Sequence, residues 1–361
     1  MSNIRPIAIH LPQFHPIPEN DIWWGEGFTE WTNTKKSVPR FENHYQPHEP
    51  SDLGYYDLRN LDSLKAQAQL ASEYGIYGFC FYHYWFNGKR VLEKPVDTIL
   101  QNKDYSFPFC LCWANENWTR RWDGNDKEVL LSQEYSFEDD IIHIHHLFPY
   151  FTDERYIKVA GKPLFIIYRP GLFPDIKKTI KLWRNEARKN GIGELYITYM
   201  QAFAHFQSPE SLGFDAAIEF QPDFNSVWNK SFLQKIILNI KGTLSSLKIR
   251  NNDFIFEYET LVNKSIQKKA PAYKQFPGIT PMWDNSARRA TGATIFHGST
   301  PKLYGEWLRH ILEKFKPFSK DENFIFINAW NEWAEGNHLE PCKKWGRKYL
   351  EETKYALNEH T

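Results

Sequence analysis

The sequence predicts one large (β/α)8 barrel, a ring of eight parallel strands surrounded by helices. Short apolar runs rich in β-branched and aromatic residues recur along the 361 residues, and segments with helical apolar spacing lie between them. Such alternation is typical of parallel βαβ units. Polar and aromatic residues also cluster directly after nearly every apolar run, and barrel enzymes carry their active sites at that end of the strands.

Each predicted strand is a short apolar run that stops at polar or aromatic residues. In chain order these runs are 5–11, 75–84, 107–113, 163–168, 195–200, 215–220, 278–283 and 324–328. The spacing of roughly 45 residues exceeds the ~30 of a minimal βαβ unit because several loops after the strands are long.

Each predicted helix has apolar residues three or four positions apart, as at Leu61, Leu64 and Ala68. In chain order the predicted helices are 59–74, 91–101, 138–151, 175–189, 209–212, 258–269, 302–314 and 343–357. Residues 223–256 break the alternation and are interpreted as an insertion. Because no linker or low-complexity stretch interrupts the rest, we expect residues 1–361 to form a single domain.

The composition narrows the choice of partner. Lys+Arg and Asp+Glu number 44 each, so no global field attracts nucleic acid. Aromatic residues make up 17%, with 14 Trp. Flat rings that also hydrogen-bond suit a carbohydrate cleft, although an aromatic-rich core is an equally good explanation for any single residue.

We expect neither a metal nor another cofactor. The four Cys form no CxxC pair. His143 and His146 would share one helix face, but no carboxylate or Cys completes a ligand set, so a solvated helix face is expected there.

The chain start has no charged segment followed by an apolar one, and no run approaches 18 apolar residues, so a cytoplasmic location is expected. The insertion intersperses basic with apolar residues and leaves two interpretations open. It either contacts an anionic membrane surface, which would suit a lipid-linked glycan, or packs as a helix over the barrel. The basic residues are Lys230, Lys235, Lys241, Lys248 and Arg250.

The segment after the eighth predicted strand carries the most specific signal. Asn331-Glu332-Trp333-Ala334-Glu335 places two carboxylates among tryptophans. Residues three apart lie on one helical face, roughly 5–6 Å apart at Cβ. Glycosidic-bond cleavage uses two such carboxyl groups, and neighbouring carboxylates raise one another's pKa so that one can serve as acid. Glu332 and Glu335 are therefore the predicted catalytic pair.

Other strand ends supply an alternative pair and the substrate-binding candidates. Glu116, in Asn115-Glu116 after the third predicted strand, could pair with Glu332 instead, although sugar binding is the favoured role for both residues of that dipeptide. Each candidate has packing or structural ion pairing as its alternative. The predicted substrate-binding residues are His15, Trp24, Glu30, Trp31, Tyr82, His83, Trp113, Asn115, Glu116, Tyr168, Arg169, Glu219, Trp283, Asp284 and Asn331.

Four motifs together resemble WbsX-type proteins, which are similar to glycoside hydrolase family 99, the endo-α-mannosidase family. They are 331–341 (NEWAEGNHLEP), 9–15 with 24–31, 78–85, and 113–118 (WANENW). The resemblance covers nearly the whole chain. It implies a (β/α)8 barrel and retention of configuration. By that family's mechanism Glu332 would deprotonate the sugar's own 2-hydroxyl, giving a 1,2-anhydro sugar, and Glu335 would protonate the leaving oxygen.

The resemblance also implies a role in bacterial O-antigen, lipopolysaccharide, capsule or related surface-glycan assembly. A retaining hydrolase or transglycosylase acting on an oligo- or polysaccharide is therefore the favoured function. A glycosyltransferase is the first alternative, although the sequence has no Asp-x-Asp metal site, P-loop or GxGxxG motif. A non-catalytic carbohydrate-binding barrel is the second.

Overall fold

The computed structural model describes residues 4–120, 125–202, 207–227, 247–250 and 253–360. Most of the insertion, 228–246, lies outside these residues, as do Lys230, Lys235 and Lys241. Its last part forms a strand, and the side chains of Lys248 and Arg250 are not described.

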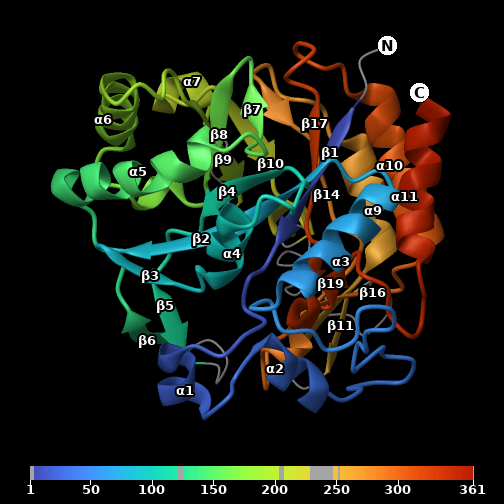
Figure 1. Ribbon diagram of the computed structural model, residues 1–361. Helices are drawn as coiled ribbons and strands as arrows, with labels where there is room; N and C mark the ends of the chain where they lie inside the picture. Colours follow the sequence, from blue (N-terminus) through green and yellow to red (C-terminus); the bar gives the residue numbers. More distant parts are fainter. Residues whose placement is uncertain (1–3, 121–124, 203–206, 228–246, 251–252, 361) are drawn as a thin grey trace, which may run out of the picture.

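A ring of parallel strands forms the centre of the molecule (Figure 1). Its order follows the chain, and every neighbouring pair is parallel. The strands are β1 (Arg5–His10), β2 (Gly78–Phe86), β4 (Phe109–Trp113), β8 (Lys162–Ile167), β9 (Tyr196–Gln201), β10 (Ala216–Glu219), β13 (Gln275–Phe276), β14 (Gly278–Ile279) and β17 (Phe324–Ile327). Because β13 pairs with β10, β14 pairs with β17, and only Pro277 separates them, the two short strands act as one interrupted seventh strand. The fold is the predicted (β/α)8 barrel.

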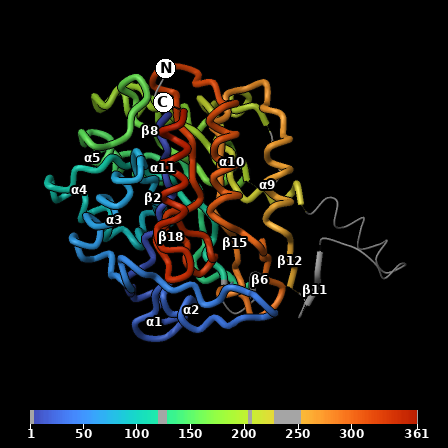
Figure 2. The backbone as a smooth tube through the Cα atoms, turned by 90° about the vertical axis from the view of Figure 1, so that its right-hand side faces the viewer, coloured from blue at the N-terminus to red at the C-terminus, as the bar shows by residue number. Residues whose placement is uncertain are grey.

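Helices pack around the ring and bury their apolar stripes against it. In α6 the stripe consists of Ile176, Ile180, Trp183 and Ala187, and the Asp175 side chain caps the first turn. The barrel helices are α3 (Leu61–Glu73), α4 (Lys94–Gln101), α5 (Phe137–Thr152), α6 (Ile176–Lys189), α7 (Pro209–Leu212), α9 (Tyr258–Gln267), α10 (Pro301–Lys314) and α11 (Lys348–His360). Figure 2 shows α9, α10 and α11 side by side.

A second, four-stranded sheet was not predicted. It has the order β11-β12-β16-β15, with β11 (Leu247–Arg250), β12 (Asp253–Glu257), β15 (Trp283–Asp284) and β16 (Thr294–His297). The prediction of one strand over 278–283 was therefore wrong at its end. The barrel strand stops at Ile279, and Trp283 pairs with Phe296 in the second sheet.

The remaining elements decorate the loops. Two helices of the first loop are α1 (Pro18–Trp24) and α2 (Glu30–Lys36); they lie at the lower end of Figure 1, toward which β1 runs. Strand β3 (Lys89–Val91) follows β2 and pairs with it antiparallel, and β7 (Lys158–Val159) precedes β8 and pairs with it antiparallel. A separate hairpin consists of β5 (Trp118–Arg120) and β6 (Asn125–Leu131). The short 3-10 turns include η2 (Pro170–Leu172), η3 (Asn285–Ala287) and η4 (Trp333–Glu335). The strands β18 (Asn331–Glu332) and β19 (Asn337–His338) pair antiparallel.

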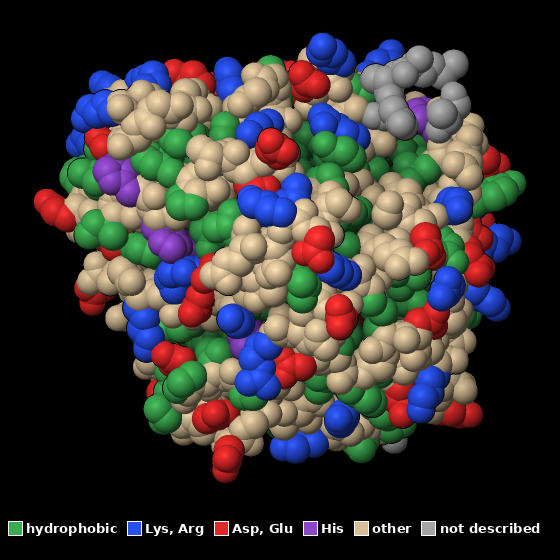
Figure 3. All heavy atoms as spheres, viewed as in Figure 1, with side chains coloured by type: hydrophobic (Ala, Val, Ile, Leu, Met, Phe, Trp, Pro, Cys, Tyr) green, Lys and Arg blue, Asp and Glu red, His purple; other side chains and the backbone are tan. Residues whose placement is uncertain are grey.

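The visible surface mixes the two charge signs. In Figure 3, Lys and Arg side chains lie interspersed with Asp and Glu over the whole face, in keeping with the net charge of zero. None of the helices in the described part of the chain combines the length and apolar character needed to cross a bilayer.

Candidate active site

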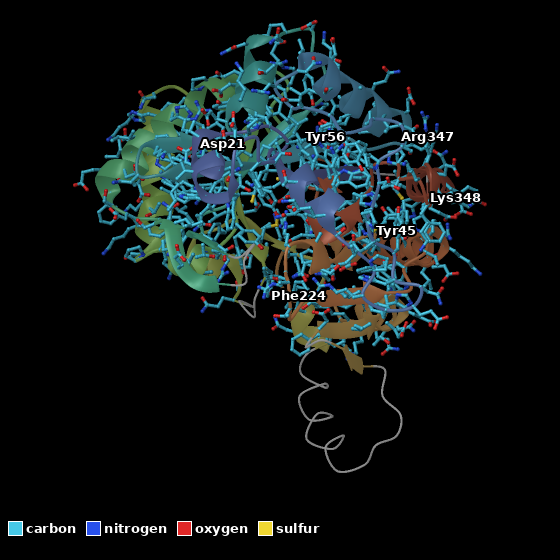
Figure 4. The ribbon with its side chains drawn as sticks, turned by 90° about the horizontal axis from the view of Figure 1, so that it is seen from below. Asp21, Tyr45, Tyr56, Phe224, Arg347 and Lys348 are labelled. Atoms are coloured by element: carbon cyan, nitrogen blue, oxygen red, sulfur yellow. The ribbon has the colours of Figure 1, made fainter. Side chains whose placement is uncertain are left out.

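A cavity of about 630 Å³ opens where the barrel strands end. Figure 4 views the molecule from this end and labels Asp21 of α1 and Phe224. Aromatic rings and a few charged groups make up much of its wall. The lining includes Trp23, Trp24, Tyr82, Tyr84, Trp118, Tyr168, Phe220, Phe224, Trp283, Glu116, Arg288, Arg289, Glu332 and Glu335.

Glu332 and Glu335 reach this cavity from one tight turn. Strand β17 is fully buried, and the chain then forms the β18–β19 hairpin, with η4 between its strands. Glu332 directly precedes the 3-10 turn that ends at Glu335, and side chains three apart in such a turn project in nearly the same direction. Gly336 follows with φ 53°, a left-handed conformation that favours glycine.

Arg288 joins these two carboxylates to a third one. Its Nη1 donates to Glu335 Oε1 at 2.5 Å, and its Nη2 donates to Glu332 Oε2 and Glu30 Oε1, both at 2.8 Å. Glu30 is fully buried, and the same Oε1 accepts the backbone N–H of Ala334 at 2.8 Å. The guanidinium thus connects α2, the loop after η3 and the η4 turn.

The ionisation of Glu332 is strongly perturbed. Burial raises its pKa to about 8, and the carboxylates of Glu335 and Glu30 add to the rise, while Arg288 acts in the opposite direction. Burial alone would lower the pKa of Arg288, but the same three carboxylates raise it well above its ordinary value. The buried position and the neighbouring carboxylates thus disfavour the ionised form of Glu332.

Buried hydrogen bonds fix the turn that bears the two acids. The Asn331 side chain accepts the Leu11 N–H at 2.7 Å and donates to the Leu11 carbonyl at 3.0 Å, which ties β18 to the end of β1. Glu340 accepts from Trp333 Nε1 at 2.6 Å, Tyr56 Oη at 2.8 Å and Gln67 Nε2 at 2.7 Å. Asn331 and Glu340 thus hold the turn in place through buried hydrogen bonds. Asn331 is not one of the described residues that line the cavity.

The alternation of β2 separates its polar residues. Tyr82 and Tyr84 point into the cavity, whereas His83 points outward and contacts His143 of α5, with 2.9 Å between their Nε2 atoms. Trp113 lies beside His83 in register and packs outward against Trp183. The expectation of a solvated face at His143 was wrong, since this side chain is fully buried.

The segment after β4 contributes one cavity residue of the predicted dipeptide. Glu116 lines the cavity and forms an ion pair with Arg169. Asn115 is buried and holds the Arg169 backbone, donating to its carbonyl at 2.9 Å and accepting its N–H at 2.8 Å. Tyr168, which directly precedes Arg169 in the chain, also lines the cavity.

Some of the other predicted substrate-binding residues line the cavity, and the rest lie outside its wall. Trp24 and Trp283 line the cavity, while His15, Trp31, Glu219 and Asp284 are not part of its wall among the described residues. Burial lowers the pKa of His15 to about 4. Trp31 packs on Trp333 with 5.4 Å between ring centroids, and Glu219 pairs with Lys268 at 2.8 Å.

Asp284 holds the second sheet's loop in place. Its Oδ2 accepts from His44 Nε2 at 2.6 Å and Gln46 Nε2 at 2.7 Å, and its Oδ1 accepts the Ser286 N–H, which starts η3. Burial opposes the charge of Asp284, but these hydrogen bonds, first that of His44, bring its pKa below the ordinary value. The η3 turn leads directly to Arg288.

Sequence reasoning missed Arg288, Tyr84 and Asn20, all in the cavity wall. Tyr84 could have been found from the period-2 alternation that places it on the same face as Tyr82. Arg288 follows a strand end as the other candidates do, and a buried acid pair needs a cation nearby. Nothing in the sequence around Asn20 distinguishes it from other loop residues.

Comparison with solved structures shows which proteins share this fold. The solved structure of a glycoside hydrolase family 99 endo-α-mannosidase from Bacteroides thetaiotaomicron matches with TM-score 0.58 and 14% identity, covering 99% of this chain and 97% of that one. A glycoside hydrolase-like protein matches with TM-score 0.59 and 14% identity, covering 99% and 94%. At this identity the matches establish a shared fold.

Sequence relatives are closer. The uncharacterized protein WxcX of Xanthomonas campestris pv. campestris (strain B100) is 42% identical over 355 residues, which is 97% of this chain and 49% of that protein. WxcX of a second strain matches to the same extent. The chain spans about half the length of these curated relatives. The family model described as glycosyltransferase WbsX matches residues 6–353, so the chain belongs to the WbsX family.

Proposed function

We propose that this chain is a retaining glycoside hydrolase or transglycosylase that cleaves a glycosidic bond in a bacterial O-antigen, capsule or related glycan. One observation carries the proposal. Glu332 and Glu335 leave one short turn at the mouth of the barrel and line the same aromatic-walled cavity. Paired carboxyl groups on either side of an acetal oxygen are the machinery of glycosidic cleavage.

The fold shared with an endo-α-mannosidase supports the reaction class, and the WbsX resemblance supports a surface glycan as substrate. The cavity is wide enough for a few sugar rings, since binding sites for small ligands measure about 300–1,000 Å³. Trp24 and Trp283 offer faces for stacking, and Tyr82, Tyr168 and Glu116 offer hydrogen-bonding groups.

In the proposed mechanism, Glu332 takes the proton of the sugar's 2-hydroxyl as that oxygen attacks C1. Glu335 gives a proton to the departing glycosidic oxygen, and a 1,2-anhydro sugar forms. Glu335 then takes a proton from water or an acceptor hydroxyl, whose oxygen attacks C1 with a second inversion. The C1–O2 bond of the three-membered ring breaks, and Glu332 returns its proton to the 2-oxygen. The high pKa of Glu332 suits its step, because a more basic carboxylate removes a hydroxyl proton more effectively.

The test is to change each acid separately in the purified chain. Glu332→Gln and Glu335→Gln should each lower turnover on a cleavable bacterial polysaccharide about 10²–10⁴-fold, the usual contribution of a general acid or base. Glu313→Gln, on the exposed face of α10, is the matched control and should leave turnover unchanged. Proton NMR of the first-formed product should show the anomer of the substrate. Full activity of either acid variant would refute the pair.

The family description favours a glycosyltransferase as the second candidate. Calorimetry with a panel of nucleotide sugars distinguishes the two, because a transferase should bind its donor tightly and a hydrolase should not. Binding of an oligosaccharide without cleavage or transfer over long incubation would instead indicate a carbohydrate-binding barrel.

A further inference from the structure

The cluster around Arg288 contains more negative charge than its single guanidinium balances. Three carboxylates, those of Glu30, Glu332 and Glu335, contact one cation. Their side chains are largely shielded from water, with exposed fractions of 0%, 6% and 19%, and Arg288 has 20%. In such surroundings charges interact strongly, so each member affects whether the others are ionised.

The contacts of Arg288 also fix geometry. Its two terminal nitrogens engage Glu335 and Glu332 separately, and a planar guanidinium holds two carboxylates in a defined relative orientation. Glu30 in turn fixes Arg288 and the η4 backbone with one oxygen atom, through Arg288 Nη2 and the Ala334 N–H. The first loop of the barrel therefore reaches across to hold the turn after the last strand.

We propose that Arg288 and Glu30 are a positioning pair for the proposed catalytic acids: Arg288 orients Glu332 and Glu335 and favours their charged forms, while Glu30 anchors Arg288 and opposes the ionisation of Glu332. The proposal rests on the proposed function for its kinetic consequence. Its structural and electrostatic content can be measured without turnover.

Among the described residues, groups from two further elements act on Glu332. Glu335 acts on it from η4, and Tyr82 and Tyr84 face it from β2. Burial raises the pKa of both tyrosines well above 10, and nearby charges, Glu332 among them, raise them further. The tyrosines thus stay neutral in the working range, and in the described part of the chain the charges that act most strongly on Glu332 are Arg288, Glu335 and Glu30.

Opposite shifts follow for the two partners. Loss of the Arg288 charge removes the stabilisation of ionised Glu332, so its pKa should rise. Loss of the Glu30 charge removes a like charge, so the pKa of Glu332 should fall. A nearby charge typically moves a carboxyl pKa by about one to three units.

The experiment compares Arg288→Met, Arg288→Lys and Glu30→Gln. Glu30→Gln keeps an oxygen that can accept the Ala334 N–H. Arg288→Lys keeps the positive charge but loses the planar guanidinium that donates to two carboxylates at once. In the pH dependence of kcat/KM, the acidic limb set by Glu332 should move up by at least about one pH unit in Arg288→Met and down in Glu30→Gln. Arg288→Lys should keep the limb within about half a unit of the native position but lower kcat. Limbs that stay in place, or that both move the same way, would overturn the proposal.

A second readout separates this proposal from the proposed function. Carboxyl ¹³C NMR of Glu-labelled protein, with Glu332→Gln to assign the signal, follows the titration of Glu332 without substrate. Opposite shifts in the two variants support the positioning pair even if no polysaccharide is cleaved, and their absence refutes it even if one is. Glu116→Gln is the matched control, because it removes a carboxylate from the same cavity that pairs with Arg169 instead. Circular dichroism confirms that each variant is folded.

Discussion

At the scale of single residues, the site departs from a simple pair of acids. Glu332 is buried and resists ionisation, whereas Glu335 is more exposed and forms the 2.5 Å contact with Arg288. The proposed mechanism makes Glu332 the base, and a base must first lose its proton. The reverse assignment, with Glu332 as the proton donor, would give the opposite pH dependence.

The pH profile should therefore decide the roles. If Glu332 is the base, kcat/KM should rise as pH passes through about 8, the pKa of Glu332 in the free protein. Measurements of kcat/KM should cover about pH 6 to about pH 10 in steps of about half a unit. A fall in kcat/KM through the same region would instead make Glu332 the acid, with Glu335 as its ionised partner.

A second residue-scale prediction concerns Glu340. Its carboxylate accepts three buried donors, from Trp333, Tyr56 and Gln67. Glu340→Gln places an NH2 group against one of them, and a buried donor left without an acceptor costs about 1–3 kcal/mol. Urea denaturation should show this loss in the free energy of unfolding, whereas the exposed Glu313→Gln should stay within about 0.5 kcal/mol of native. An unchanged Glu340→Gln would mean that the network is dispensable.

The residue scale also shows what a sequence reveals about a site. The Asn-Glu-Trp-Ala-Glu spacing identified two carboxylates that do share one cavity. Arg288 carries no motif, and it comes close to Glu30 only because the barrel closes, 258 residues apart along the chain. His83 and Trp113 were chosen by their position at strand ends, but the direction in which each side chain points depends on the phase of its strand.

At the scale of elements, the apolar runs predicted the barrel strands well. Their residues are buried on both faces, so hydrophobicity marks them clearly, as in β17 with all four residues buried. The second sheet was missed because its strands are only two to five residues long and pair across distant segments. Helix α11 begins at Lys348, not at the predicted 343, because Lys343–Gly346 are occupied by turns and bridges that tie Cys342 to Pro50 and Gly346.

The packing of α5 against β2 makes a prediction about acid stability. Burial lowers the pKa of His83 and of His143 well below 6.5. Arg90 and His146 lower the pKa of His83 further, and His83 and His146 do the same to His143. The unfolded chain therefore binds more protons below pH 6.5, and stability is lost as pH falls through that value. His143→Phe keeps a ring against Trp85 and removes one titrating group. The slope of the unfolding free energy should therefore drop by about 0.7 kcal/mol per pH unit at pH 6.5, where the unfolded imidazole is half protonated, and by about 1.4 kcal/mol per pH unit near pH 5. Urea titrations at several pH values measure it; an unchanged slope would mean that His143 is not the source.

At the scale of the whole molecule, the net charge does not favour any one class of charged partner. The net charge is zero, and the face in Figure 3 mixes both signs, so neither the net charge nor this face provides long-range attraction to an anionic membrane. The prediction for the insertion at 223–256 thus depends on its own basic residues.

Vesicle flotation tests that prediction with the native chain and with Lys230, Lys235 and Lys241 changed to Gln. If the insertion contacts membrane, the native chain should float with anionic vesicles, stay down with neutral ones, and lose binding in the variant, since each basic residue near the surface contributes about 1 kcal/mol. A chain that stays down with anionic vesicles would leave packing over the barrel as the explanation.

The contact of Gly336 with Asp284 has a mechanical consequence. A Cβ at position 336 would lie 2.9 Å from Asp284 Cβ and 3.1 Å from its carbonyl oxygen, and the left-handed φ already disfavours a side chain. A single methyl group would therefore act as a wedge between the loop that leads to the guanidinium and the loop that carries the acids. Because Gly336 has no side chain, the two loops can pack directly against each other. The spacing of charges on which the proposed chemistry depends therefore relies on a residue that has no functional group.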